Sequence, residues 1–196
     1  VPEGEADSAR RCLGIVVSES QRLSRLIGNV LTFAKPKVQQ ANPTPNIPDE
    51  LIHETLEHFR PSLETQKFEI EFDAGAPQQV QIDADILEQI LGNLFSNVEK
   101  YAACGKSLTI TSRQDGDMTV ITVSDSGPGV PAGQREKIFK PFHRLSNQLS
   151  DGVSGTGIGL TIARNLARVH GGDLTLTNRR DSGGCTFTLR LETGHI

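Results

Sequence analysis

The chain has 196 residues, a size that suits one domain, or one domain with a small addition, and that can bury a core without disulfide or metal support. Lys and Arg number 20 against 24 Asp and Glu, and the net charge of −4 argues against a general nucleic-acid binder. The three cysteines, Cys12, Cys104 and Cys185, lie far apart with no metal-ligand spacing, which is typical of reduced thiols in a cytosolic domain.

The sequence has no apolar run of the about 18 residues that span a membrane, and no signal peptide. We therefore expect this part of the protein to be cytoplasmic. Because the chain begins at Val1 rather than Met, we expect further segments upstream, and any membrane contact of the full-length protein would lie in them.

The segment from about residue 9 to residue 35 is predicted to form one long helix. It lacks proline, and apolar residues recur at positions 13, 16, 23, 27, 30 and 34. So narrow an apolar stripe needs a partner helix, and dimerisation is favoured over docking within the chain. Prolines from Pro36 onward end the helix and indicate a linker with an extended segment. We expect the helix in residues 1–36, the linker in 37–47 and a second domain in 48–196.

Residues 48–196 combine helical and strand patterns. Apolar periodicity predicts helices over about 48–63, 83–103 and 159–170, the second capped at its start by Asp83. Strands are predicted over about 67–73, 80–82, 107–113, 118–124, 173–177 and 186–191. Hairpin turns are expected at residues 115–116 and 181–184. This order predicts an α+β fold, a two-layer sandwich with a mixed, mostly antiparallel sheet, preceded by the long N-terminal helix.

The predicted helix over 83–103 carries a polar row. Gln89, Asn93, Asn97 and Tyr101 are spaced four residues apart, so they share one face, and Lys100 lies beside them. Asn is unfavourable inside a helix, and a solvated face is the simpler interpretation of the row. The alternative is that amide oxygens hold a hard cation such as Mg²⁺ together with substrate phosphates, with Lys100 available to an anion.

Two glycine-rich stretches follow. Asp125 ends a predicted strand ahead of Gly127 and Gly129, so its carboxylate can face an uncrowded pocket and accept from an amino group such as that of adenine. An ordinary Asp-Gly turn is the simpler interpretation of Asp125 alone. Residues 155–160, GTGIGL, lead into a helix, and their backbone N–H groups can bind an anion. They match neither a Walker A loop nor a dinucleotide fingerprint.

Taken in order, these segments resemble the ATP-binding boxes of sensor histidine kinases. Residues 93–101, NLFSNVEKY, resemble the N box, and residues 125–129, DSGPG, resemble the G1 box. Residues 137–142, KIFKPF, resemble the F box, and residues 155–160 resemble the G2 box. The fold implied is the one shared with gyrase, Hsp90 and MutL. The resemblance extends from about residue 10 to residue 192, and the first helix looks like the second helix of the family's dimerisation and phosphotransfer hairpin.

The resemblance implies roles for the polar row and the strand-end carboxylate. Asn97 would ligate Mg²⁺ with Asn93 beside it, and Lys100 would reach a phosphate. Tyr101 would pack by the adenine of ATP, and Asp125 would accept from its amino group. Related ATPases have a Glu general base where this chain has Asn93, so we expect weak intrinsic hydrolysis, as suits a kinase.

The glycine-rich segments and the F box would complete the site. Gly127 and Gly129 would leave room for the nucleotide, and Arg144 would meet the γ-phosphate charge. The other residues expected to contact the nucleotide are Phe142, Gly155, Thr156, Gly157, Gly159 and Leu160. Residues from about 140 to 156 would form a lid over ATP. Asn93, Lys100 and Arg144 are the catalytic candidates.

The resemblance implies that the γ-phosphate of ATP passes to a histidine and then to an Asp of a response-regulator receiver domain. The family's acceptor histidine would precede residue 9, so this chain alone is not expected to phosphorylate itself. His53 is read as an ordinary helix residue, and His170 as a cation at a helix C-terminus. Family members form homodimers through the hairpin and are often anchored in the inner membrane.

Two alternatives remain open. One is a protein-serine kinase of the anti-sigma type, which shares the boxes, although the long N-terminal helix argues against it. The other is a regulatory or dimerisation module that binds nucleotide without kinase activity. Tyr101 is the only tyrosine and Trp is absent, so tyrosine fluorescence would report on the nucleotide site.

Overall fold

The structure is a computed structural model that describes Ser20 and residues 40–145, 156–179 and 183–194. The chain divides into two units, residues 1–37 and 38–196, and the helices and strands described below all belong to the second unit. The predicted helix over residues 9–35, the glycine Gly155 and most of the predicted lid lie outside the described residues.

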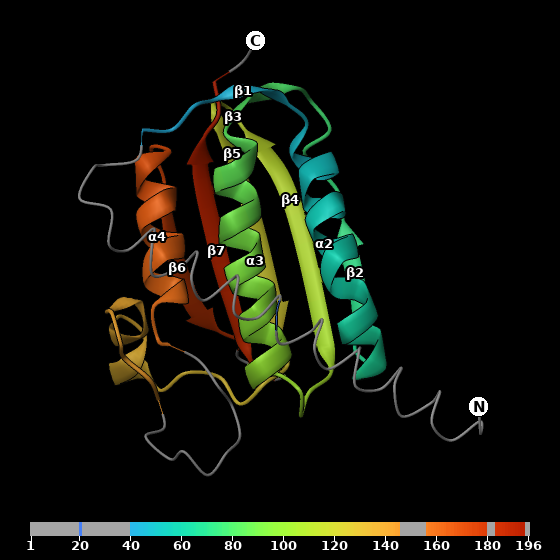
Figure 1. Ribbon diagram of the computed structural model, residues 1–196, viewed down its shortest axis with the longest axis vertical. Helices are drawn as coiled ribbons and strands as arrows, with labels where there is room; N and C mark the ends of the chain where they lie inside the picture. Colours follow the sequence, from blue (N-terminus) through green and yellow to red (C-terminus); the bar gives the residue numbers. More distant parts are fainter. Residues whose placement is uncertain (1–19, 21–39, 146–155, 180–182, 195–196) are drawn as a thin grey trace. The chain divides into compact units, whose positions relative to one another are not determined.

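The described part of the second unit contains three α-helices and seven strands (Figure 1). The helices are α2 (Pro48–Thr65), α3 (Ala84–Tyr101) and α4 (Gly159–Val169). The strands are β1 (Thr44–Asn46), β2 (Glu69–Asp73), β3 (Val80–Ile82), β4 (Ser107–Asp115), β5 (Met118–Asp125), β6 (Asp173–Asn178) and β7 (Cys185–Glu192). Two short 3₁₀ turns, η1 (Ala132–Gln134) and η2 (Lys137–Phe139), precede α4. The predicted helices and strands of this unit are confirmed to within a few residues.

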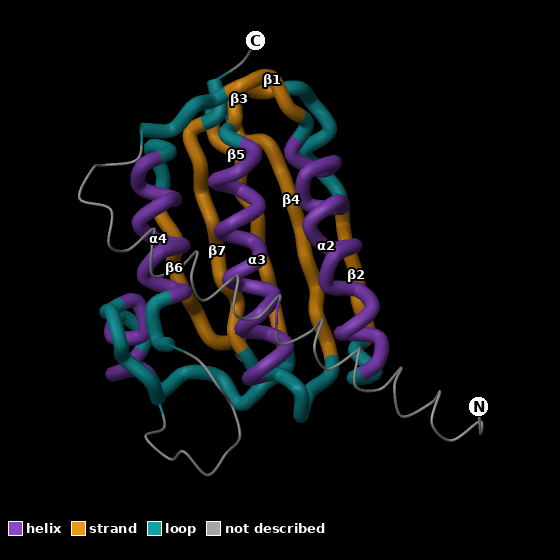
Figure 2. The backbone as a smooth tube through the Cα atoms, viewed as in Figure 1, coloured by secondary structure: helices purple, strands orange, loops and turns teal. Residues whose placement is uncertain are grey.

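Five strands form one sheet in the order β2-β4-β5-β7-β6. Only the β2–β4 pair is parallel, so the sheet is mixed and mostly antiparallel, as predicted. All three helices cover one face of this sheet, which gives the expected two layers (Figures 1 and 2). β1 pairs with β3 in a separate two-stranded sheet, so residues 44–46 of the expected linker are built into the second unit.

The hydrophobic core lies between the helices and the sheet. α3 supplies its central row, with Ile86, Leu87, Ile90, Leu91, Leu94, Phe95 and Val98 all buried. Burial of this face leaves the polar row of α3 to one side, where it can meet α4. None of the described helices is long and apolar enough to cross a bilayer.

Asp83 connects three segments at the start of α3. Its Oδ1 accepts from the N–H of Ile86, 3.0 Å away, which confirms the predicted cap. Its Oδ2 accepts from the N–H of Asn42, 2.8 Å away, where the chain enters the unit. Its own N–H donates to Nε2 of His170 at 2.9 Å, just beyond α4. The reading of His170 as a cation is therefore wrong, because a nitrogen that accepts a hydrogen bond carries a lone pair rather than a proton.

Candidate functional site

The N-box, G1-box and G2-box residues meet at one end of the sheet. α3 and α4 run in opposite directions, so the end of α3 and the start of α4 lie near the end of β5 (Figure 1). Gly127, just after β5, is so close to the end of α3 that an added Cβ would lie 3.1 Å from Ala102 Cα. A Cβ on Gly159, the first residue of α4, would lie 2.7 Å from Oδ1 of Asn93.

Asp125 is the buried carboxylate of this site, with 6% of its surface exposed. Its Oδ1 accepts from the N–H of Gly127 at 2.7 Å and from the N–H of Cys185 at 3.3 Å. No described residue donates to Oδ2, which leaves that oxygen to accept from a ligand. Burial raises the pKa of Asp125 above its ordinary value, although both backbone hydrogen bonds and the charge of Arg179 oppose the rise. The interpretation as a simple turn does not explain this burial.

Two glycines that the sequence reasoning missed support the segment after β5. A Cβ on Gly105 would lie 1.9 Å from the carbonyl oxygen of Ser126. A Cβ on Gly184 would lie 2.0 Å from the carbonyl oxygen of Asp125, and the φ of Gly184 is +87°. The paired glycines before β7 were a usable signal, but they were read only as a turn.

Asn178 fixes the same segment at Val130, further along the chain from β5. Its Oδ1 accepts from the N–H of Val130 at 3.1 Å, and its Nδ2 donates to the carbonyl of Val130 at 2.9 Å. The side chain thus pairs with the backbone as a neighbouring strand would. Gly129 lies against this amide, with a Cβ position 3.1 Å from Nδ2. Gly129 is therefore required by packing, in addition to the room for a ligand that the sequence suggested.

The polar row of α3 is half-buried at its centre, so it is not a solvated face. Nδ2 of Asn93 donates to the carbonyl of Gln89 at 2.9 Å, which fixes the amide and turns its Oδ1 toward Gly159. Nδ2 of Asn97 is buried and has no hydrogen-bond partner among the described residues. A buried N–H that is left without an acceptor costs about 1–3 kcal/mol, so this amide nitrogen is open to an acceptor such as a ligand oxygen.

The side-chain oxygens that this row offers to a cation include the amide oxygens of Asn93 and Asn97. The described residues contain no cluster of three or more His, Cys, Asp or Glu side chains that could hold a metal alone. Mg²⁺ is commonly held by one or two protein oxygens together with substrate phosphates and water. Lys100 and Tyr101 are exposed on the last turn of α3, next to the same end of the sheet.

The F box and the G2 box are joined through the backbone. The N–H of Phe142 donates to the carbonyl of Gly157 at 2.9 Å. Gly157 has a φ of +69°, and a Cβ there would lie 3.0 Å from the carbonyl carbon of Phe142. Phe142 itself is 67% exposed, and half-buried Arg144 and Thr156 flank the join. Leu160 packs against the hydrophobic core.

Comparison with known proteins gives one family match, over residues 82–195, to the histidine kinase-, DNA gyrase B- and HSP90-like ATPases. Among curated proteins, the chain is 32% identical over 198 residues to the sensor histidine kinase WalK of Bacillus subtilis, covering 93% of this chain and 31% of WalK. It is 29% identical to the sensor-like histidine kinase SenX3 of Mycolicibacterium smegmatis, covering 95% of this chain and 49% of SenX3. The chain thus spans half or less of the length of these relatives.

Solved structures share the fold. The catalytic domain of the histidine kinase ThkA matches with a TM-score of 0.68 and 28% identity, over 78% of this chain and 97% of that domain. Full-length ShkA, whose structure is a complex with AMPPNP, matches with a TM-score of 0.78 over 95% of this chain and 39% of ShkA. At 24% identity, the likeness to ShkA shows the fold alone.

Proposed function

Because the chain belongs to the family of histidine kinase-, DNA gyrase B- and HSP90-like ATPases, we propose that it is the ATP-binding catalytic domain of a sensor histidine kinase. Its relatives among curated proteins are sensor histidine kinases. The observation that carries the proposal is the buried Asp125, whose Oδ2 has no donor among the described residues and whose neighbour Gly127 lies against the end of α3. An acceptor for adenine at Asp125 and an anion site at the start of α4 would serve the two ends of ATP.

The adenine would be read by Asp125. Its Oδ2 accepts from the exocyclic amino group, while Gly127 and Gly129 leave the approach open. Asp125 is buried, so this hydrogen bond would select adenine, because a buried acceptor left without its donor is costly. Tyr101 lies on the last turn of α3, next to Ala102, whose Cα is within 3.1 Å of the Gly127 Cβ position.

The phosphates would lie at the start of α4. Backbone N–H groups at the N-terminus of a helix, together with the glycine-rich residues before it, attract anions. Lys100 and Arg144 add positive charge, and Thr156 adds a hydroxyl. Asn97 would hold Mg²⁺, which when bound neutralises phosphate charge and orients the γ-phosphate.

The reaction would be transfer of the γ-phosphoryl group to a histidine nitrogen. A P–N bond forms, the bond between the γ-phosphorus and the β–γ bridging oxygen breaks, the imidazole loses its proton and ADP leaves. Asn93 is an amide and cannot accept a proton from water, so the site positions the nucleotide without activating water. The acceptor histidine, homodimerisation through a helical hairpin and relay to a receiver-domain Asp belong to this proposal.

Nucleotide titration tests the site. A non-hydrolysable ATP analogue should bind more tightly with Mg²⁺ than without it, as followed by Tyr101 fluorescence. Asn97→Ala should abolish most of this Mg²⁺ dependence. Asn165→Ala, an exposed asparagine inside α4, is the matched control and should retain it. Unchanged Mg²⁺ dependence in Asn97→Ala refutes the metal assignment.

Labelling tests the chemistry. Incubated alone with γ-labelled ATP and Mg²⁺, the chain should take up no acid-labile label and release phosphate slowly. Acid-labile phosphohistidine on this chain would show that the acceptor lies within it, against the proposal. Absence of any ATP binding would remove the kinase assignment altogether.

A further inference from the structure

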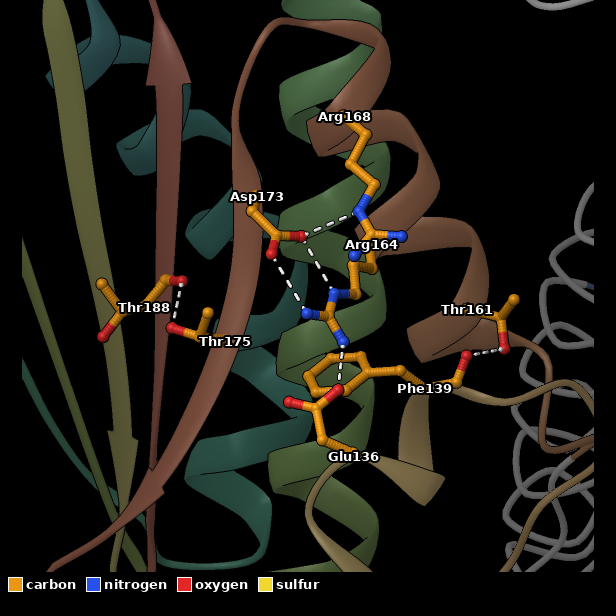
Figure 3. Close-up of polar contacts among 8 residues, drawn as sticks. All are labelled: Glu136, Phe139, Thr161, Arg164, Arg168, Asp173, Thr175 and Thr188. Carbon is orange, nitrogen blue, oxygen red and sulfur yellow. Dashed lines mark hydrogen bonds and ion pairs between the residues drawn. The ribbon is translucent and has the colours of Figure 1, made fainter.

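Arg164, on the second turn of α4, is the centre of a polar cluster outside the nucleotide site (Figure 3). Its side chain is only 14% exposed. Nε and one terminal nitrogen donate to the two oxygens of Asp173, at 2.9 and 3.1 Å. The other terminal nitrogen donates to Glu136 at 2.8 Å, and the guanidinium carbon lies 4.6 Å from the centre of the Phe139 ring.

This arrangement needs an arginine. A guanidinium can pair with two carboxylates and stack on an aromatic ring at the same time, whereas an ammonium is a single point charge. The hydrogen bond to Asp173 is the main cause of a raised pKa at Arg164, and the same bond lowers the pKa of Asp173. The Asp173 contact anchors Arg164 to β6, and the Glu136 and Phe139 contacts extend from that anchor to η2.

The contacts of Arg164 fix the F box against α4. Glu136 precedes η2 and Phe139 ends it, and the carbonyl of Phe139 also accepts from Oγ1 of Thr161 at 2.9 Å (Figure 3). Three residues further on, the N–H of Phe142 donates to the carbonyl of Gly157. The F box is therefore held at its start by the second turn of α4, and at its end by the glycine-rich residues that lead into α4.

None of these contacts involves the adenine side of the site. The partners of Arg164 lie on η2, β6 and the residue before η2, whereas Asp125 is held by the backbone of Gly127 and Cys185. A change at Arg164 should therefore affect residues 142–144 and 156–159 more directly than it affects Asp125, the residue proposed to read adenine.

We infer that Arg164 is a positioning residue for the phosphate half of the nucleotide site. It holds the F box against α4, and with it the backbone hydrogen bond from Phe142 to Gly157 that precedes the first N–H groups of α4. The inference rests on the proposed function, because it assumes that phosphates bind at the start of α4. It goes further in dividing the site into two parts with separate supports, one for adenine and one for phosphate.

The test compares ATP with adenosine. Arg164→Gln should weaken Mg²⁺-ATP binding by about fivefold to tenfold and leave adenosine binding unchanged, as measured by calorimetry and by Tyr101 fluorescence. Arg164→Lys should recover part of the loss. Arg168→Gln is the matched control, because Arg168 also pairs with Asp173, at 3.1 Å, and has no contact with Glu136 or Phe139. It should bind both ligands as the wild type does.

The outcomes separate the two proposals. Equal weakening of ATP and adenosine in Arg164→Gln would mean a general structural role and would overturn the inference, as would unchanged ATP binding. If Arg164→Gln does not fold, Glu136→Gln keeps the Asp173 pair intact and should give a smaller loss confined to ATP, and equal losses there would again refute the inference. Failure of the wild-type chain to bind either ligand would instead refute the proposed function.

Discussion

Asp125→Asn should turn the residue proposed to read adenine from an acceptor into a donor without disturbing the hydrogen bonds that hold it. The asparagine Oδ1 can still accept from the N–H groups of Gly127 and Cys185, which lie 2.7 and 3.3 Å from the carboxylate Oδ1. The nitrogen that replaces Oδ2 carries hydrogens, so it cannot accept from the adenine amino group and instead opposes it. The substitution therefore isolates one hydrogen bond to the ligand.

The magnitude follows from the charge and burial of the acceptor. A hydrogen bond to a charged group contributes about 1.5–3 kcal/mol. Since about 1.4 kcal/mol is a factor of ten, ATP affinity should fall by about 10- to 150-fold. Inosine triphosphate, which has a carbonyl in place of the amino group, should gain relative to ATP because the new nitrogen can donate to it.

Calorimetric titration of both nucleotides against both proteins measures this change. The wild type should prefer ATP strongly, and Asp125→Asn should lose or reverse that preference. Melting of the two proteins at the same pH checks that the variant is folded. A folded variant that binds ATP as tightly as the wild type would refute the assignment of Asp125 to adenine.

The free energy of unfolding should depend on pH differently in the wild type and in Asp125→Asn. Burial raises the pKa of Asp125, so the folded state holds this proton more tightly than the unfolded state does. The stability that the proton contributes is present below the ordinary carboxyl pKa of 3.8 and is lost as pH rises through the raised folded value. From about pH 4 upward, urea unfolding should therefore show the free energy of unfolding of Asp125→Asn rising relative to that of the wild type. The difference should become constant above the folded pKa of Asp125. A constant difference across this range would contradict the argument.

Three further predictions concern stability and reactivity. Gly184→Ala should cost more than about 2 kcal/mol in urea unfolding, because φ is +87° and the new Cβ would lie 2.0 Å from a backbone oxygen, whereas Gly133→Ala, which meets nothing within 4 Å, should be nearly neutral. His170→Ala should cost about 1–3 kcal/mol in the same assay by leaving the N–H at the start of α3 unpaired, and a neutral result would show that this hydrogen bond is dispensable. Cys104 is exposed and should alkylate at pH 8, whereas burial raises the pKa of Cys185 to about 11 and should protect it until the chain unfolds; labelling of both in the folded chain, read by peptide mass, would contradict this.

Local signals predicted most of the fold. Asp83 was identifiable as a cap because a short acceptor side chain preceded an apolar periodic segment, and the structure shows its Oδ1 at the N–H of Ile86. The polar row on α3 followed from helix geometry alone. The strands on either side of the turn at Gly116 followed from alternation and a turn pair. Each of these features depends on residues within one element or one hairpin.

The parts that could not be predicted depend on contacts between distant segments. Nothing local marks Gly105 as the neighbour of Ser126, because the need for a missing Cβ arises only when β4 and β5 pair. The parallel pairing of β2 with β4 likewise joins strands that are separated in the chain by β3 and α3. Arg164 reads as an ordinary charged helix residue until Glu136 and Asp173 are brought to it from two other elements.

The position of β7 has a consequence for the order in which the protein becomes functional during synthesis. β7 lies between β5 and β6, although it is the last described strand to be translated. The N–H of Cys185, the first residue of β7, donates to Oδ1 of Asp125, and Gly184 lies against the carbonyl oxygen of Asp125 at the end of β5. A nascent chain that already contains the N, G1, F and G2 boxes would therefore still lack part of the proposed adenine site. On this proposal, the domain could hold the base of a nucleotide only after β7 has left the ribosome and inserted between β5 and β6.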